Sequence, residues 1–63
     1  MIAVRAVNTD AQAAEFATIV EKHGGTVLSV AADPKSRWHV FFRVENERML
    51  TSVNAKWDTP GQA

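Results

Sequence analysis

The sequence predicts an α+β fold, a two-layer domain in which one helix packs on a mostly antiparallel sheet. The expected order is β-α-β-β, followed by a further strand or short helix. The chain of 63 residues suits one domain, over residues 1–58, with a disordered tail at 59–63. Apolar residues recur with a helical period between about residues 10 and 23, and they alternate with a strand period on both sides of that segment.

The first strand is expected at Ile2–Val7, where alternation places Ile2, Val4 and Ala6 on one face. We expect this face to lie in the core, because Arg5 on the other face marks the solvent side.

A helix is expected from about Asp10 to His23. Its start, Thr9–Gln12, has the spacing of a capping box, in which the Thr9 hydroxyl and the Gln12 amide each satisfy a backbone donor. Gly24 suits the left-handed residue that follows a helix. The apolar stripe of this helix contains Ala13, Phe16, Ala17, Ile19 and Val20.

A β-hairpin is expected next, with strands at Thr26–Ala32 and Arg37–Glu45. The residues between them, Asp33–Ser36, form a turn, because Pro34 fixes its own φ and Asp33 can bond the backbone that follows.

Residues 46–58 have two interpretations. In a helix, Asn46 is the N-cap and the apolar stripe is Met49, Leu50, Val53 and Trp57. In a strand, alternation fails only at Leu50, and residues 51–54 are mediocre helix formers. We favour the strand, after a turn at residues 45–48. The predicted core is Ile2, Val4, Phe16, Ile19, Val20, Leu28, Val30, Trp38, Val40, Phe42, Val44 and Val53.

Composition narrows the classes of protein. There is no cysteine, which excludes disulfides and thiolate metal sites. Seven basic and seven acidic residues give no general attraction to nucleic acid or to an anionic membrane. No apolar run approaches the length of a membrane span. The expectation is a cytoplasmic protein with neither a cofactor nor a membrane partner.

No catalytic or metal-binding motif occurs in the chain. The two histidines, His23 and His39, lack the spacing of a metal site, and no serine stands in a nucleophile motif. Gly24-Gly25 follows a helix instead of preceding one, so the helix dipole there has the wrong sign for phosphate. We therefore expect no enzyme activity.

The residues expected to contact a partner lie on one face of the Arg37–Glu45 strand. Alternation places Trp38, Val40, Phe42 and Val44 in the core, and the opposite face is basic with an aromatic in its middle. Trp57, near the end of the chain, is the other candidate anchor for an interface. The expected partner-binding residues are Arg37, His39, Phe41, Arg43 and Trp57.

The segments His23–Val30 and Val40–Glu45 resemble the middle of an ACT domain, a regulatory βαββαβ module. The resemblance covers residues 2–45. It implies a ferredoxin-like topology, pairing between subunits and, in some members, an amino acid bound at the subunit interface. No ligand-binding residue carries over, because the loop Val7–Asp10 lacks the glycine of those sites.

Three functions remain, in this order. The first is a non-catalytic protein-binding module, an inhibitor or adaptor that also forms a homodimer. Small proteins of this kind are typical of phages and other mobile elements, where anti-CRISPR proteins block host defence complexes. The second is an ACT-like module that binds a small metabolite at a dimer interface. The third is a weak nucleic-acid binder that uses Arg37, Phe41 and Arg43.

Overall fold

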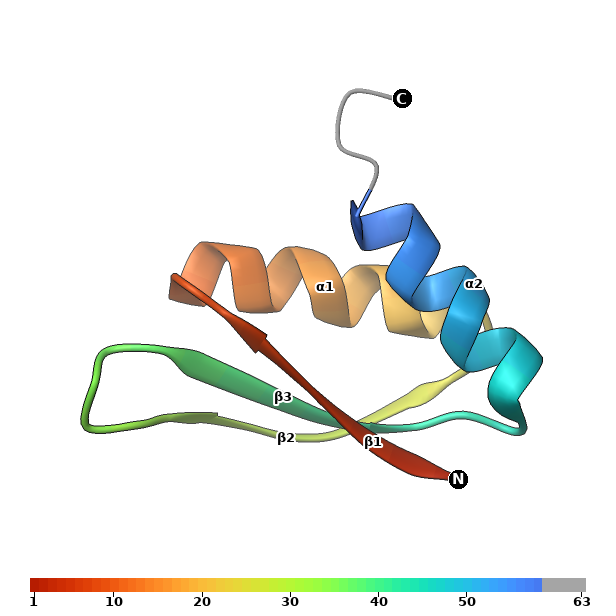
Figure 1. Ribbon diagram of the computed structural model, residues 1–63, viewed down its shortest axis with the longest axis horizontal. Helices are drawn as coiled ribbons and strands as arrows, with labels where there is room; N and C mark the ends of the chain where they lie inside the picture. Colours follow the sequence, from red (N-terminus) through yellow and green to blue (C-terminus); the bar gives the residue numbers. More distant parts are fainter. Residues whose placement is uncertain (59–63) are drawn as a thin grey trace.

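The computed structural model describes residues 1–58 and confirms the α+β fold. A three-stranded sheet forms one layer and two helices form the other, both on the same side of the sheet (Figure 1). The tail predicted at 59–63 lies outside the described residues. The elements, in chain order, are β1 (Ile2–Val7), α1 (Asp10–Lys22), β2 (Thr26–Ala32), β3 (Trp38–Arg43) and α2 (Glu47–Asp58).

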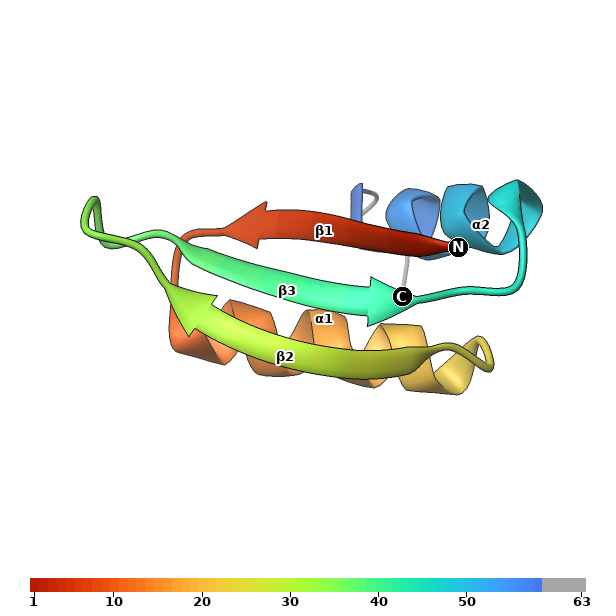
Figure 2. The same ribbon diagram turned by 90° about the horizontal axis from the view of Figure 1, so that it is seen from below.

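The strand order in the sheet is β1-β3-β2, and both neighbouring pairs are antiparallel. β3 is therefore central, and β1 and β2 are the edges of the described sheet (Figure 2). Phe41 of β3 lies opposite Val4 of β1 and Ser29 of β2. The β2–β3 register shifts between Val27 and Ser29, the mark of a β-bulge.

Both ends of α1 are stabilised by the local interactions that the sequence predicts. The Thr9 hydroxyl accepts a hydrogen bond from the Gln12 backbone N–H at 3.0 Å, and the Gln12 side chain accepts one from the Asn8 N–H at 2.8 Å. At the other end, Gly24 has a φ of 88°. Backbone N–H groups there donate back to helix carbonyls, from Gly24 to Glu21 and from Gly25 to Val20. This pair of bonds is a Schellman motif.

The last element, α2, is a helix, so the strand favoured from the sequence is wrong. The Asn46 side chain accepts a hydrogen bond from the Met49 N–H at 2.9 Å and caps the helix. Val53 is fully buried, and Trp57 meets Phe16 edge to face with ring centroids 5.5 Å apart. Burial of the stripe on one side of α2 outweighs the modest helix propensity of residues 51–54, because most helix stability in proteins comes from tertiary packing.

The core lies between the sheet and the helices. Phe16 stands at its centre, because its ring meets Phe42 of β3 at 5.3 Å as well as Trp57 of α2. Three structural elements are thus joined by one aromatic cluster. The fully enclosed core residues are Val7, Ala13, Phe16, Val20, Val40, Phe42, Val44 and Val53.

Part of the predicted core is wrong, and the largest error is the orientation of β1. Ile2 and Val4 are 67% and 54% exposed, whereas Val7 on the other face is buried. Both faces of β1 carry apolar residues, so alternation alone does not identify the buried one. Arg5 does lie on the helix side, yet its guanidinium leaves the core at the sheet edge and bonds Asn54 and Asp58 of α2.

Four further core predictions need correction. Leu28 and Val30 are each 43% exposed, because β2 is an edge strand with a bulge. Trp38 and Ile19 pack against the core but are only partly buried. Leu28 and Val30 thus lie at the edge of a sheet that is only three strands wide.

Candidate functional site

The side of the sheet that faces away from both helices is the candidate site, and we call it the open face. Phe42 and Val40 are buried beneath the helices, so alternation turns Phe41 to the opposite side. The register then assigns the rest of the face. The open face consists of Ile2, Val4 and Ala6 of β1, His39, Phe41 and Arg43 of β3, and Thr26, Ser29 and Ala31 of β2. Figure 2 views the sheet from this side.

The chemistry of the open face varies from strand to strand. Val4 lies directly opposite Phe41, and Ile2 lies opposite Arg43. Residues directly opposite on antiparallel strands have their Cβ atoms about 5 Å apart, so Val4 and Phe41 are neighbours. Phe41 is 39% exposed. The β1 side of the face is therefore apolar, and the β3 residues place two basic or titratable side chains around the one aromatic ring.

Asp33, in the β2–β3 turn, forms hydrogen bonds at one end of the open face. Its Oδ1 accepts hydrogen bonds from the backbone N–H groups of Lys35 and Arg37, at 2.9 and 3.0 Å. Its Oδ2 lies 2.9 Å from His39 Nε2. These bonds, from His39 first and then from Arg37 and Lys35, hold the pKa of Asp33 below its ordinary value. The imidazole of His39 is thereby tied to the turn.

The structure separates the predicted partner-binding residues into two groups. His39, Phe41 and Arg43 lie together on the open face, and exposed Arg37 precedes β3 at the turn. Trp57 lies in the helical layer, on the other side of the sheet, where it packs against Phe16.

The sequence prediction does not include two residues of the open face, Ile2 and Val4, because it assigns both to the core. The sequence does hold a signal for them. Val7 and Ala3 offer an alternative buried face for β1, but only the position of the helices decides between the two faces.

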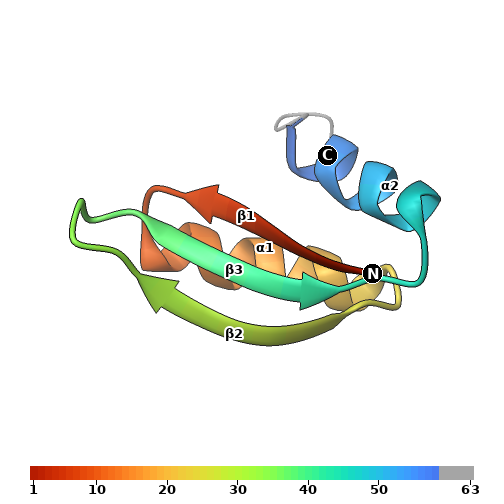
Figure 3. The ribbon, with the colours of Figure 1, turned by 60° about the horizontal axis from the view of Figure 1, so that its bottom comes forward.

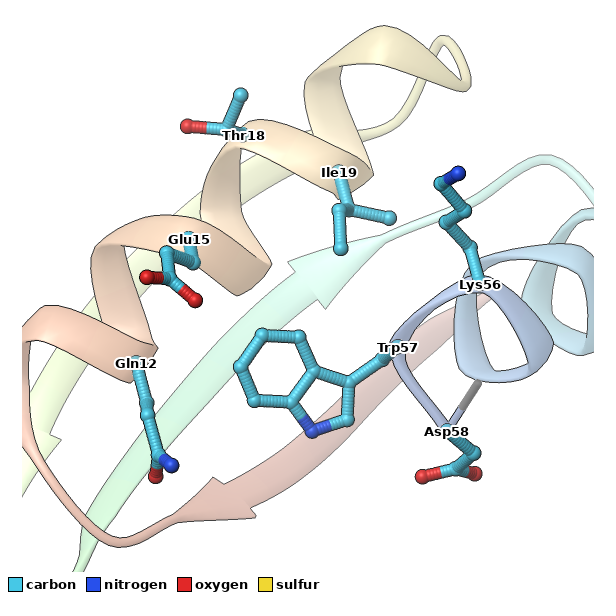
Figure 4. Close-up of a pocket in the computed structure, with 7 residues that line it drawn as sticks. All are labelled: Gln12, Glu15, Thr18, Ile19, Lys56, Trp57 and Asp58. Atoms are coloured by element: carbon cyan, nitrogen blue, oxygen red, sulfur yellow. The ribbon is translucent and has the colours of Figure 1, made fainter. Parts of the chain in front are cut away.

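A groove between α1 and α2 is a second surface feature with a defined shape. It has a volume of about 690 Å³ and includes the half-buried ring of Trp57, which stands between the helices with the Ile19 side chain directed toward it (Figure 4). Asp58 at its rim is paired with Arg5 of β1. Glu15 and Lys56 lie on opposite helices. The groove is lined by Gln12, Glu15, Thr18, Ile19, Lys56, Trp57 and Asp58.

Within residues 1–58, no group of three or more His, Cys, Asp or Glu side chains is placed to hold a metal ion. His23 is at the end of α1, where its Nδ1 bonds the Ile19 carbonyl oxygen at 2.9 Å. Neither helix in this part of the chain has the length and apolar character that a membrane crossing requires.

Comparison of the chain with protein-family models, with curated proteins and with solved structures gives no match.

Proposed function

We propose that this domain is a small, non-catalytic protein-binding module that acts as an inhibitor or adaptor through its open face. One observation supports the proposal above the others: Ile2, Val4 and Phe41 are exposed side by side on one face of the sheet. Exposed apolar residues taken singly are ordinary, whereas a contiguous apolar group bordered by polar residues is typical of an interaction site.

The residues of the open face specify the chemistry of the partner. Phe41 is the aromatic anchor, a role in which large rings dominate interface energies. Arg43 and Arg37 are cations near its border, while the β1 residues of the face carry no charge. A complementary partner presents an apolar patch with acidic groups along one side. Those rim charges govern the association rate and its salt dependence more than the affinity.

The size of the open face sets the expected strength of binding. The register assigns nine residues to the open face, whereas a standard protein interface uses about 20–30 residues on each side. A standard protein interface buries about 800 Å² on each partner. One copy of the domain therefore offers at most about half of a standard interface, and we expect it to bind weakly through this face alone.

Nucleic acid is the weaker candidate for the same face. Sequence-independent binding to single strands uses several aromatic rings for stacking and a continuous basic groove. On the open face, Phe41 is the one aromatic among the nine residues assigned by the register, and its β1 border is Ile2 and Val4. An apolar border favours a protein partner.

The test compares two variants that carry the same new charge on opposite layers of the domain. Phe41→Asp places a carboxylate at the centre of the open face, and Thr51→Asp places one at an exposed position of α2. Proteins captured from a lysate by the wild-type domain are identified by mass spectrometry. We expect partners that the Thr51→Asp domain retains and the Phe41→Asp domain loses, because a buried, unpaired carboxylate is costly at an interface.

Circular dichroism controls for folding of both variants. A set of captured proteins that Phe41→Asp leaves unchanged would exclude the open face as the binding surface. Captured nucleic acid, released by nuclease or by moderate salt, would favour the alternative function.

A further inference from the structure

The two edges of the sheet differ, and we propose that the β1 edge pairs with β1 of a second copy around a two-fold axis. The product is a continuous six-stranded sheet in which two open faces lie side by side. This inference deepens the proposed function, because it supplies the missing half of the interface area, but its own test does not require the partner protein.

Sheet edges that stay unpaired usually carry protection, such as a bulge, a proline or an inward-pointing charge. β2 has a bulge between Val27 and Ser29. β1 contains neither a proline nor a register shift against β3. Its one inward-pointing charge, Arg5, is paired with Asp58 of the same chain, so a second strand beside β1 would not meet an uncompensated charge. Of the two edges in the described sheet, β1 is the one that remains open to strand pairing.

The backbone groups at the free edge of β1 follow from the ladder with β3. Met1 and Val44 exchange two hydrogen bonds, at 3.0 Å from Met1 N to Val44 O and at 2.9 Å from Val44 N to Met1 O. In an antiparallel ladder such bonded pairs alternate along the strand. Ala3 and Arg5 therefore bond β3, and the N–H and C=O groups of Ile2, Val4 and Ala6 point away from it.

These three outward residues define a symmetric register. A two-fold axis perpendicular to the sheet at Val4 places Val4 opposite Val4 of the second copy and Ile2 opposite Ala6 of the second copy. Every outward residue of β1 then takes part in a bonded pair. Arg5 faces Ala3 of the second copy, so the two guanidinium groups are not directly opposed. The chain has a formal net charge of zero, which removes long-range repulsion between copies.

The position of α2 is compatible with this pairing. Seen from the open face, α2 lies behind the first half of β1, on the helix side, and extends beyond the N-terminal end of the strand (Figures 2 and 3). Its last turns are fixed near the middle of β1, because Arg5 bonds both Asn54 and Asp58. Only the first half of β1 is therefore flanked by α2. The two-fold axis makes the two paired β1 strands antiparallel, so their first halves lie at opposite ends of the pair. The α2 helices of the two copies therefore also lie at opposite ends.

Pairing of two copies also enlarges the surface that a partner protein can contact. A two-fold axis perpendicular to the sheet keeps both open faces on the same side. Two faces of nine residues then form one surface of 18 residues, close to the roughly 20–30 residues that a standard interface uses on each side. Val4 of each copy stands at the centre of this joined surface.

The test is sedimentation equilibrium of the 63-residue chain over micromolar to millimolar concentrations, with two variants at one position. Val4→Pro removes the outward N–H but no bond to β3, and Val4→Ala keeps that N–H. We expect wild type and Val4→Ala to dimerise, with dissociation constants within about tenfold of each other. Val4→Pro loses both bonds of the central pair and should dimerise at least about 100-fold more weakly.

Two further measurements keep the test decisive if Val4→Pro fails to fold. A synthetic chain with N-methylvaline at position 4 removes the same N–H and keeps the side chain. In wild type, amide hydrogen exchange at Ile2, Val4 and Ala6 should slow as concentration rises, while exchange at Ala3 and Arg5 is slow throughout.

A wild-type chain that stays monomeric at every concentration overturns the proposal. So does a dimer that survives N-methylation at Val4. A dimer lost in Phe41→Asp but retained by the N-methylated chain would show that two open faces pack against each other instead. Loss of partner capture in Phe41→Asp together with a monomeric wild type would leave the proposed function standing and refute only the pairing of β1.

Discussion

Phe41 and Phe42 are adjacent residues of the same type with opposite surroundings. Phe42 is 1% exposed and contacts Phe16 beneath the helices, whereas Phe41 is 39% exposed on the open face. The alternation of β3 predicts this difference from the sequence, and the structure confirms it. Substitutions at these two positions therefore compare what a core ring and a surface ring of the same strand contribute to the free energy of unfolding.

We predict that alanine at these two positions has very different effects on the free energy of unfolding. Phe42→Ala leaves a cavity beside Phe16 and should cost about 3–5 kcal/mol, enough to unfold much of so small a domain. Phe41→Ala should cost no more than about 1 kcal/mol, because its ring is already partly in water. Urea denaturation followed by circular dichroism measures both. Equal destabilisation would mean that Phe41 is a core residue.

Asp33 gives the hairpin a dependence on pH. Its pKa is below the ordinary value in the folded chain, where His39 and two backbone N–H groups bond its carboxylate. The Asp33 carboxylate binds a proton more readily in the unfolded chain than in the folded one. Its bonds therefore stabilise the fold fully above the ordinary pKa of an aspartate, and this stabilisation is lost as the pH falls through the lowered pKa of the folded chain.

We predict that Asp33→Asn removes this component of the acid sensitivity. Aspartates protonate roughly between pH 6 and pH 2.5. Over this range the urea midpoint of the wild type should fall more than the midpoint of the variant, since the asparagine does not titrate. Other carboxylates contribute equally to both chains, so the difference between them reports Asp33. Parallel curves would show that its hydrogen bonds do not stabilise the folded state.

At the scale of elements, α2 shows why a pattern with two interpretations needs a tertiary contact to decide it. Its stripe fits a helix, and an alternating strand fails only at Leu50. Local propensity favours the strand, but the strand interpretation offers no place for Val53 and Trp57 against Phe16 of α1. The N-cap at Asn46 then satisfies a backbone donor at the start of the helix.

We predict that Asn46→Ala weakens α2 and lowers the free energy of unfolding by about 1 kcal/mol, since the Met49 N–H loses its acceptor. Thr51→Ala, at an exposed position inside the helix, is the control. It should leave stability unchanged or raise it by a few tenths of a kcal/mol, because alanine has the higher helix propensity. Thermal unfolding measures both. An unaffected Asn46→Ala chain would show that packing alone positions α2.

At the scale of the whole molecule, the decisive fact is that both helices cover the same side of a three-stranded sheet. The opposite side is then left to solvent whatever its composition. In this chain that side holds Ile2, Val4 and Phe41. The exposed apolar residues of this side are the ones to which the proposed function assigns partner binding.

The sequence alone determined the features that depend on neighbouring residues. It predicts α1 with both of its caps, the Asp33–Ser36 turn, the two faces of β3, and Phe41 as a surface aromatic. Each depends on a hydrogen bond or an alternation that is complete within a few residues. A capping box or a Schellman motif forms in the same way wherever the helix packs.

Only the tertiary structure decided which face of β1 is buried, that residues 47–58 are a helix, and that Ile2 and Val4 join Phe41 on one surface. The physical reason is common to all three. β1 has apolar residues on both faces and α2 has a pattern with two periods, so the local free energies of the alternatives are close. Packing against α1 and Phe16, which are distant in sequence, makes the difference.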